Sequence, residues 1–396
     1  MNILLLVDNF TPDLGASSFR FEAIVKELAN QGNKVEVIAS YPNRIKSNNF
    51  KEFKYENVKI IRVKNRNEKK DIINRAINYL WYFVNSIKVG VKISKKSDLV
   101  IATSPQLLVG VSGAVISLLS RKPFLVDIRD LWPDIVLDMK VMKKINPIYI
   151  VLKILENFMY KKSSFLVYNS PGFEEYLNSK KNIKKKALIT NGLDNYILEN
   201  FKNKDPKVTK KKNYKILYAG NIGIAQNLKI LIEFAKRLES KIEVVIIGQG
   251  SQEEDIKNEI KEKKIRNVEV KKAIPREQLF EEYEKADILF LQLKNIAMFK
   301  KTIPSKIFEY LATRKPIIYG LEGIGKKILK EEFKVKYYFK QDNLESLVET
   351  FYELENDIEN NKYIMPDIIK LEKNYSRTNL SRNYVKIIND NFNKGI

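Results

Sequence analysis

The sequence contains no cysteine and no histidine. Without cysteine the chain can form neither a disulfide nor a thiolate metal site, which suits a reducing compartment such as the cytoplasm. Without histidine it has no imidazole metal ligand and no histidine-based catalytic triad. Any proton transfer must therefore use aspartate, glutamate, lysine, tyrosine or the substrate itself.

Long runs without charge are also scarce. One of them, residues 99–119, has the length of a membrane span. Pro105, Gln106 and several serine, threonine and glycine residues interrupt it, so we predict a strand, a loop and a helix instead. The amino terminus has no basic region and no small-residue cleavage site, and we expect it to form a buried strand rather than a signal peptide.

Positive charge is what the chain has in excess. Its 396 residues include 71 lysines and arginines against 48 aspartates and glutamates, which gives a formal net charge of +23. A hydrophobic content of 44% fits a soluble globular protein, and the length fits two or three domains. A basic balance attracts nucleic acid, anionic lipid or phosphorylated substrates. Because no nucleic-acid-binding motif is apparent, we expect a membrane surface with lipid phosphates rather than nucleic acid.

The first half has the alternating pattern of a doubly wound parallel sheet. Buried strands are expected at 2–7, 34–39, 99–102, 124–128, 165–169 and 187–192. Gly15 precedes a helix expected over 17–30 and would let a ligand approach the backbone, although an ordinary turn is the simpler interpretation. Arg20 in that helix is an expected anion contact. Ser104, after the strand at 99–102, is a further candidate for ligand contact.

A polar segment, D-I-R-D-L-W-P-D, follows the strand at 124–128. Open parallel sheets bind ligands at the carboxyl ends of their strands. In one interpretation Asp130 faces the reacting hydroxyl, Arg129 orients that hydroxyl or contacts phosphate, and Trp132 lines the site. In the other, an aspartate and an arginine form a structural ion pair beside a packed tryptophan.

Two segments of the first half, residues 71–96 and 139–162, combine aromatic and aliphatic residues with lysines. Such helices can lie in a membrane interface, with rings at the headgroup level and lysines facing anionic lipid. Core helices with an aromatic stripe and solvated ends are the alternative.

The second half starts after a polar, lysine-rich stretch, residues 195–213, which we interpret as an interdomain connection. A strand expected at 214–219 then enters G-N-I-G, and a helix follows. Gly220, Asn221 and Gly223 therefore precede a helix amino terminus, where backbone N–H groups and the helix dipole can bind phosphate.

A second candidate binding element lies at residues 302–319. Pro304 and Ser305 are expected to start a helix, with the serine capping free backbone N–H groups. Glu309 lies off the apolar face of that helix, one turn from its start. The polar loop, helix start and carboxylate predict a site for nucleotide phosphate and ribose. A capped helix before a buried strand at 316–319 is the alternative.

Five segments, in order, resemble the family 4 glycosyltransferases of bacteria, and within them the surface-polysaccharide branch that includes N-acetyl-L-fucosamine transferases. They are T-P-D-L-G-A-S-S-F-R (11–20), D-I-R-D-L-W-P-D (127–134), Y-A-G-N-I-G-I-A-Q-N-L (218–228), I-P-R-E-Q-L (274–279) and the segment 302–319. The similarity spans nearly the whole chain.

This resemblance implies an α/β fold of the GT-B type, with two doubly wound Rossmann-like domains facing a cleft. We expect an acceptor-binding domain at 1–195, a donor-binding domain at 196–374, and a helix in 375–396 that crosses back to the first domain. The implied reaction transfers a sugar from a UDP-sugar to a lipid-linked (undecaprenyl-type) glycan in capsule or O-antigen synthesis, with retention. The protein would be cytoplasmic and peripheral on the inner face of the membrane.

The resemblance also assigns roles to residues. Glu309 would accept a ribose hydroxyl, the loop with Gly220 would bind the diphosphate, and Gly15 would face the cleft. That loop has no arginine or lysine, unlike most of the wider family, so we expect Lys306 to supply the positive charge, with Lys301 as second choice. Lys301 also stands where the family typically has the first of two glutamates.

No cofactor is expected, and because no Asp-x-Asp occurs we expect no metal. Two alternatives stay open. One is a sugar-nucleotide epimerase on the same fold, and the other is a non-catalytic basic protein that binds membrane or nucleic acid.

Overall fold

The computed structural model describes residues 1–396 except 14, 43–51, 65–71, 105, 141 and 394–396. The chain divides into two compact units. The first unit holds Met1–Gly192 and resumes at Arg377, and the second holds Leu193–Ser376. The boundaries expected from the sequence, after residues 195 and 374, lie within a few residues of these.

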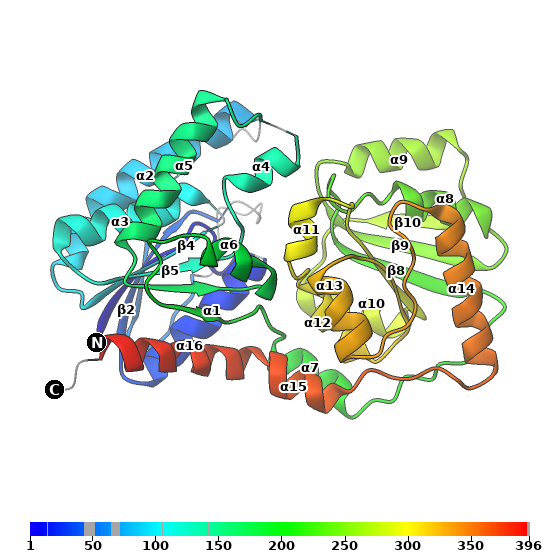
Figure 1. Ribbon diagram of the computed structural model, residues 1–396. Coiled ribbons are helices and arrows are strands. Elements are labelled where there is room, and N and C mark those ends of the chain that lie inside the picture. The colour runs from blue at the N-terminus through cyan, green and yellow to red at the C-terminus, as the bar shows by residue number, and fades with distance from the viewer. Residues whose placement is uncertain (14, 43–51, 65–71, 105, 141, 394–396) are drawn as a thin grey trace. The chain divides into compact units, whose positions relative to one another are not determined.

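Seven parallel strands form the sheet of the first unit, in the order β3-β2-β1-β4-β5-β6-β7 (Figure 1). They are β1 (Asn2–Leu6), β2 (Lys34–Ser40), β3 (Val58–Val63), β4 (Leu99–Thr103), β5 (Phe124–Ile128), β6 (Phe165–Tyr168) and β7 (Lys186–Leu188). The winding direction reverses between β1 and β4, as in a doubly wound sheet. The sequence pattern does not predict β3, because charged residues interrupt this edge strand, and β7 is shorter than expected.

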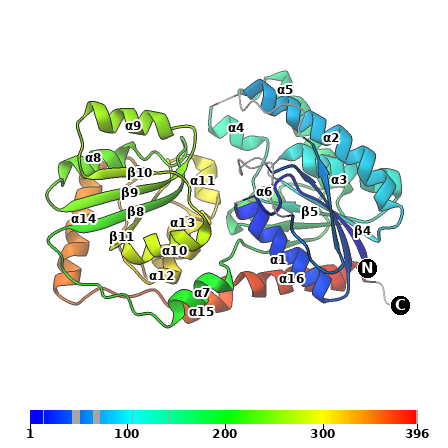
Figure 2. The same cartoon turned by 180° about the vertical axis from the view of Figure 1, so that it is seen from behind.

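Helices cover both faces of this sheet. They are α1 (Ala16–Asn30), α2 (Ile72–Ser94), α3 (Leu107–Ser120), α4 (Asp134–Asp138), α5 (Pro147–Lys162), the 3-10 turn η1 (Pro171–Phe173), α6 (Glu174–Asn178) and α16 (Arg377–Phe392). α1 and α16 pack together on one face, and α2, α3 and α5 lie side by side on the other (Figures 1 and 2). The charge-free run forms β4, a loop and α3, as predicted.

Five parallel strands form the sheet of the second unit, in the order β10-β9-β8-β11-β12. They are β8 (Tyr214–Asn221), β9 (Ile242–Gln249), β10 (Val268–Lys271), β11 (Ile288–Gln292) and β12 (Ile317–Gly320). The helices are α7 (Asn195–Lys202), α8 (Lys229–Arg237), α9 (Glu253–Glu262), α10 (Arg276–Lys285), α11 (Ala297–Lys301), α12 (Lys306–Thr313), α13 (Ile324–Lys326), the π-helical η2 (Lys327–Glu332), α14 (Leu344–Glu359) and α15 (Ile368–Tyr375).

Alternate residues of the central strand β8 pack into two hydrophobic cores, one on each face of the sheet. Ile216 and Tyr218 pack in the core closed by α8 and α14. Leu217 and Ala219 pack in the core closed by α7, α10, α12 and α15. A strand that is buried on both faces is expected in a parallel sheet covered by helices.

The interpretation of residues 195–213 as a connection is wrong for its first part. Residues Asn195–Lys202 form α7, and Ile197, Leu198 and Phe201 are buried in the second unit. These apolar residues lie at i, i+1 and i+4, which places them on one helical face. The lysines that follow hide this short pattern when the whole stretch is averaged.

Candidate functional site

The candidate donor site lies at the carboxyl edge of the second unit's sheet. From β8 the chain proceeds outward through β9 and β10, then returns to the other side of β8 with β11 and β12. Ligands of open α/β sheets bind at such a point, where loops from two neighbouring strands diverge. The loop after β8 and the amino terminus of α12 both belong to this edge.

Gly220 is the last residue but one of β8 and lies against the side chain of Lys306. A Cβ added to Gly220 would lie 1.8 Å from Lys306 Cε and 2.0 Å from Lys306 Nζ, so the lysine can occupy this place only because residue 220 has no side chain. The φ of Gly220, +148°, also disfavours other residues. The structure thus brings together two residues that lie far apart in the sequence.

The ammonium group of Lys306 is held by Tyr218. Lys306 Nζ donates a hydrogen bond of 2.8 Å to the Tyr218 hydroxyl and lies 4.3 Å from the centre of that ring. Burial lowers the pKa of Lys306 to about 8, and the negative charge of Glu309 acts in the opposite direction. The amine is therefore largely cationic at neutral pH, at the amino terminus of α12 where the helix dipole adds positive potential.

The glycine loop after β8 is closely packed. Asn221 Nδ2 donates to Gln226 Oε1 at 3.0 Å, and a Cβ on Gly223 would lie 2.5 Å from that Nδ2. Gly250, after β9, also touches this loop, since a Cβ there would lie 2.2 Å from the Ile222 carbonyl oxygen. The sequence pattern treats Gly250 as an ordinary turn residue, and the pairing of β8 with β9 is what places it here.

Glu309 lies on the first turn of α12 and is half-buried. Its Oε2 accepts a hydrogen bond of 2.8 Å from the Tyr283 hydroxyl on α10. The tyrosine fixes the carboxylate, a contribution that sequence reasoning missed because Tyr283 carries no motif of its own. The Arg276 side chain, in the predicted segment I-P-R-E-Q-L, lies outside the described residues.

Ser305 precedes α12 but does not cap it as predicted. Its side chain makes no capping hydrogen bond. The reason is that Ser305 has helical dihedrals, φ −59° and ψ −25°, whereas a side-chain cap requires an extended residue. Lys301, the second choice for a phosphate contact, ends the neighbouring helix α11.

In the first unit, the polar segment after β5 is fastened to the end of β4. Ser104 N donates to the Asp127 carbonyl at 3.0 Å, and Ser104 Oγ accepts from Arg129 N at 3.1 Å. Ser104 is buried and therefore holds the segment in place rather than presenting a free hydroxyl. Arg129, Asp130 and Trp132 are half-buried at this carboxyl edge.

Asp130 has the most unusual environment of these residues. Burial raises the pKa of Asp130 to about 6, and the positive charge of Arg129 opposes the rise. A carboxylate with a pKa near 6 is ionised at neutral pH, yet it is a stronger proton acceptor than an ordinary aspartate.

Arg20 does not serve as the predicted anion contact in this structure. Its Nε and Nη2 donate to Asp127 Oδ2 at 3.1 and 2.9 Å, and its Nη1 donates to the Thr190 carbonyl at 2.7 Å. Both members of the ion pair are buried. A structural pair of the kind considered for this region therefore exists between Asp127 and Arg20. Gly15 stands at the amino terminus of α1 with an extended backbone.

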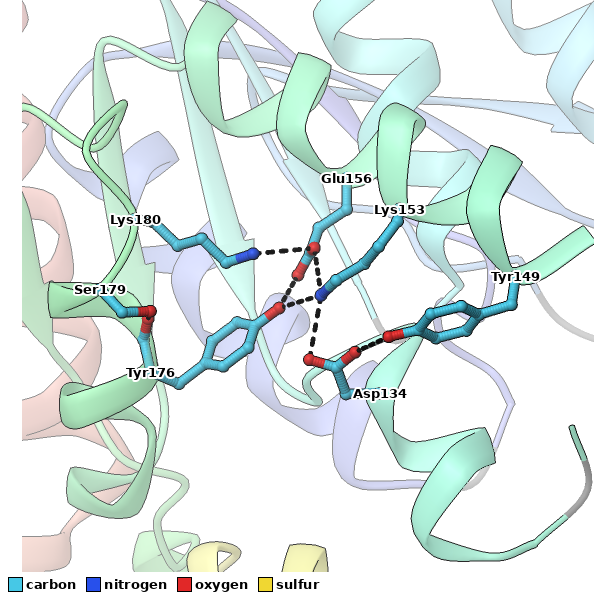
Figure 3. Close-up of polar contacts among 7 residues, drawn as sticks. All are labelled: Asp134, Tyr149, Lys153, Glu156, Tyr176, Ser179 and Lys180. Carbon is cyan, nitrogen blue, oxygen red and sulfur yellow. Dashed lines mark hydrogen bonds and ion pairs between the residues drawn. The ribbon is translucent and has the colours of Figure 1, made fainter. Parts of the chain in front are cut away.

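A polar network that the sequence does not reveal lies beyond Trp132. Asp134 opens α4, Tyr149 and Lys153 come from α5, and Tyr176 comes from α6 (Figure 3). Tyr149 donates to Asp134 Oδ1 at 2.6 Å, and Lys153 donates to Asp134 Oδ2 at 2.9 Å and to Glu156 Oε2 at 2.7 Å. The spacing of Tyr149, Lys153 and Glu156 on one helical face is the signal that could have indicated it.

The described ranges hold neither a carboxylate metal cluster nor a membrane-spanning helix. In those ranges no group of three or more aspartate or glutamate side chains is placed to hold a metal ion. No described helix is both long enough and apolar enough to cross a bilayer.

Residues 199–367 match the family model described as Glycosyl transferases group 1. No curated protein matches the sequence.

Solved structures cover the whole chain at low identity. The chain is similar to the sucrose-phosphate synthase of Thermosynechococcus elongatus, with a TM-score of 0.76, 13% identity and 100% of each chain covered. It is similar to the Anabaena protein HepE in complex with UDP and glucose, with a TM-score of 0.70, 13% identity and coverage of 98% and 100%. It is also similar to WaaG, a glycosyltransferase involved in lipopolysaccharide biosynthesis, with a TM-score of 0.61, 12% identity and coverage of 99% and 96%.

The predicted α/β fold of two doubly wound units is therefore confirmed. The chain has the fold of GT-B glycosyltransferases, and residues 199–367 of its second unit match the glycosyl transferases group 1 model.

Proposed function

We propose that the protein is a glycosyltransferase that moves a sugar from a UDP-sugar to a lipid-linked glycan at the inner face of the cell membrane. The observation that carries the donor half is the arrangement of Gly220, Lys306 and Glu309 at one sheet edge. It offers a cation beside glycine backbone for the diphosphate, and a carboxylate one helical turn away for the ribose. HepE, on the same fold, binds UDP in its solved complex.

In the proposed reaction, Lys306 and the backbone N–H groups of the glycine loop stabilise the charge that develops on the UDP leaving group. No metal takes part. Asp130 orients the acceptor hydroxyl, with Arg129 beside it, and is not an obligatory base because the reaction retains configuration. The motifs shared with N-acetyl-L-fucosamine transferases support an N-acetylated amino sugar as donor and a place in capsule or O-antigen synthesis.

The membrane half of the proposal rests on the layer formed by α2, α3 and α5. Helix α5 exposes Ile150, Val151 and Ile154, the last to 62%, while its charged Glu156 is fully buried. Helix α2, on the other side of α3, exposes Tyr79, Leu80, Trp81 and Val84. Exposed apolar residues gathered on one helical layer favour an interaction site there.

Exposed lysines border this apolar surface. They are Lys88, Lys92, Lys95 and Lys96 towards the end of α2 and Lys140, Lys143 and Lys144 before α5. Aromatic and aliphatic side chains bordered by lysine match an anionic bilayer, and we propose that this face lies on the membrane. Of the two segments predicted from the sequence, residue 71, the Arg75 side chain and Val141 lie outside the described residues.

A turnover assay separates this proposal from the two alternatives. The protein is incubated with UDP-N-acetylated amino sugars, and vesicles of phosphatidylethanolamine and phosphatidylglycerol carry undecaprenyl-linked glycans from bacterial membranes. A transferase releases UDP only when the lipid-linked acceptor is present. Interconversion of the free UDP-sugar without lipid would indicate an epimerase. Absence of both UDP-sugar binding and turnover would favour a non-catalytic binding protein.

A further inference from the structure

Helix α5 buries several polar side chains and exposes several apolar ones. The side chains of Tyr149, Lys153 and Glu156 form hydrogen bonds with other elements of the unit (Figure 3). Ile150 and Ile154 are exposed. An ordinary surface helix buries its apolar face and exposes its charges. Helix α5 therefore contacts its own unit partly through polar side chains and partly through apolar ones such as Met159, which packs against Gly110 of α3, and it leaves other apolar side chains exposed.

The inner contacts of α5 converge on one carboxylate. Asp134 accepts from the Tyr149 hydroxyl at 2.6 Å and from Lys153 Nζ at 2.9 Å. Burial alone would raise the pKa of Asp134, but these two donors outweigh it and hold the pKa below its usual value. The carboxylate therefore stays ionised and paired at neutral pH.

The other end of the network leads away from the candidate active site. Lys153 also pairs with Glu156 Oε2 at 2.7 Å, and Glu156 in turn accepts from Tyr176 and from Lys180 at 3.3 Å. Glu156 therefore belongs to the same network but makes none of the contacts to Asp134.

Asp134 is the residue through which α5 reaches the candidate acceptor loop. It follows Pro133 directly and stands four residues after Asp130. The loop between them contains Trp132, and Ser104 anchors its beginning to β4 through Arg129. The loop is thus held at both ends, by the sheet at Arg129 and by α5 at Asp134.

A partly buried ion pair adds little net stability compared with apolar residues of similar size, but it fixes the geometry of the elements that it joins. Apolar side chains could hold α4 against α5 equally firmly. They would not prescribe one position for the first residue of α4, as a carboxylate with two directed donors does.

We propose that Asp134 and Lys153 are positioning residues that tie the loop 129–133 to the lipid-facing helix α5. Contact of α5 with an anionic bilayer then sets the position of Asp130 and Trp132. The inference rests on the membrane contact in the proposed function. It adds that the carboxylate that orients the acceptor is held relative to the lipid surface from which the acceptor emerges.

The two tryptophans of the chain allow a direct test. Trp132 lies in the loop, and Trp81 lies on the exposed face of α2. The variant Trp132→Phe leaves only Trp81, which reports bilayer contact. The variant Trp81→Phe leaves only Trp132, which reports the loop. Emission and acrylamide quenching of each are measured with phosphatidylcholine vesicles that do or do not contain phosphatidylglycerol, and flotation confirms binding.

We expect anionic vesicles to shift Trp81 emission to shorter wavelength and to change the quenching of Trp132. Asp134→Asn or Lys153→Met should abolish most of the Trp132 response and leave the Trp81 response intact. Tyr149→Phe, which removes one donor without changing charge, should weaken the Trp132 response, and Lys153→Arg should preserve it. Lys180→Met is the matched control, because it removes a lysine that pairs with Glu156 rather than with Asp134, and it should keep both responses.

Two results would overturn the inference in different ways. An unchanged Trp132 response in folded Asp134→Asn or Lys153→Met would show that this link does not position the loop, while the membrane proposal stands. A parent protein whose Trp81 does not respond to anionic vesicles would remove the membrane contact and this inference together. The UDP-binding part of the proposed function would still stand on its own measurements.

Discussion

The carboxyl edges of the two sheets hold their charged groups in different ways. In the second unit, Lys306 lies against a tyrosine hydroxyl and a glycine backbone. In the first unit, Arg20 and Lys153 each bind carboxylates that belong to other elements. Lys306 of the second edge is thus held by a neutral hydroxyl and could contact a diphosphate, whereas Arg20 and Lys153 of the first edge are paired with carboxylates of the same unit.

Removal of Arg20 should have the largest effect on stability. Arg20→Ala leaves Asp127 buried and unpaired, which should lower the free energy of unfolding by about 3–5 kcal/mol. Lys26→Ala on the same helix removes a half-exposed pair with Glu22 and should cost no more than about 0.5 kcal/mol. Urea unfolding of both variants measures the difference, and equal midpoints would contradict the importance of the buried pair.

Gly220→Ala tests the other edge. Its Cβ must displace Lys306, so UDP affinity should fall roughly 10- to 100-fold, as it should in Lys306→Met, because a charged hydrogen bond contributes about 1.5–3 kcal/mol. The double variant should be no weaker than either single one, since both remove the same contact. Gly32→Ala is the control, because Gly32 has a φ of +80° but no atom within 4 Å of the added Cβ. Calorimetric titration with UDP gives all four affinities.

The two edges should also titrate in different pH ranges. Asp130 becomes a carboxylate as the pH rises through about 6, so acceptor turnover should increase across that range. Lys306 loses its proton as the pH rises through about 8, so UDP affinity should decrease there. Asp130→Asn should remove the rise of acceptor turnover near pH 6. Lys306→Met should remove the fall of UDP affinity near pH 8. If turnover in Asp130→Asn still rises near pH 6, or UDP affinity in Lys306→Met still falls near pH 8, the assignment of that change to the substituted residue is wrong.

The smallest effect is expected at Glu309. If its carboxylate accepts a ribose hydroxyl, Glu309→Gln should weaken UDP binding about five- to tenfold, the size of one hydrogen bond. Tyr283→Phe removes the donor that orients the carboxylate and should weaken UDP binding less than Glu309→Gln does. Neither variant should alter the affinity for inorganic diphosphate. A loss of diphosphate binding in Glu309→Gln would mean that the residue supports the loop rather than the ribose.

The same contrast explains what could be predicted from the sequence. The strands of both sheets follow from apolar runs bounded by glycine and polar turns. The residues of the second edge follow from glycines before one helix, α8, and from a carboxylate on the first turn of another, α12. These are local patterns. The sequence therefore indicated Gly220, Lys306 and Glu309, although not that the lysine lies on the glycine.

The contacts of the first edge join residues far apart in the chain, and no sequence pattern predicts them. Arg20 and Asp127 lie 107 residues apart, and Asp134 and Lys153 lie 19 apart on different helices. Only the strand order and the packing of α5 bring them together. The short helix α7 was also missed. Its apolar residues pack against α12 and α15, but the lysines that follow it mask the apolar pattern in the sequence.

The most direct test of the account is the thermal midpoint of the parent protein with UDP, a UDP-N-acetylated amino sugar and GDP, beside Lys306→Met and the exposed-surface control Glu254→Gln. A ligand that binds only the folded state raises the midpoint by mass action. A free ligand concentration of about 100 times the Kd adds about 2.7 kcal/mol to the free energy of unfolding. We predict a rise with the uracil nucleotides in the parent and the control, a smaller rise in Lys306→Met, and little with GDP. No rise with any uracil nucleotide would contradict the assignment of the donor site.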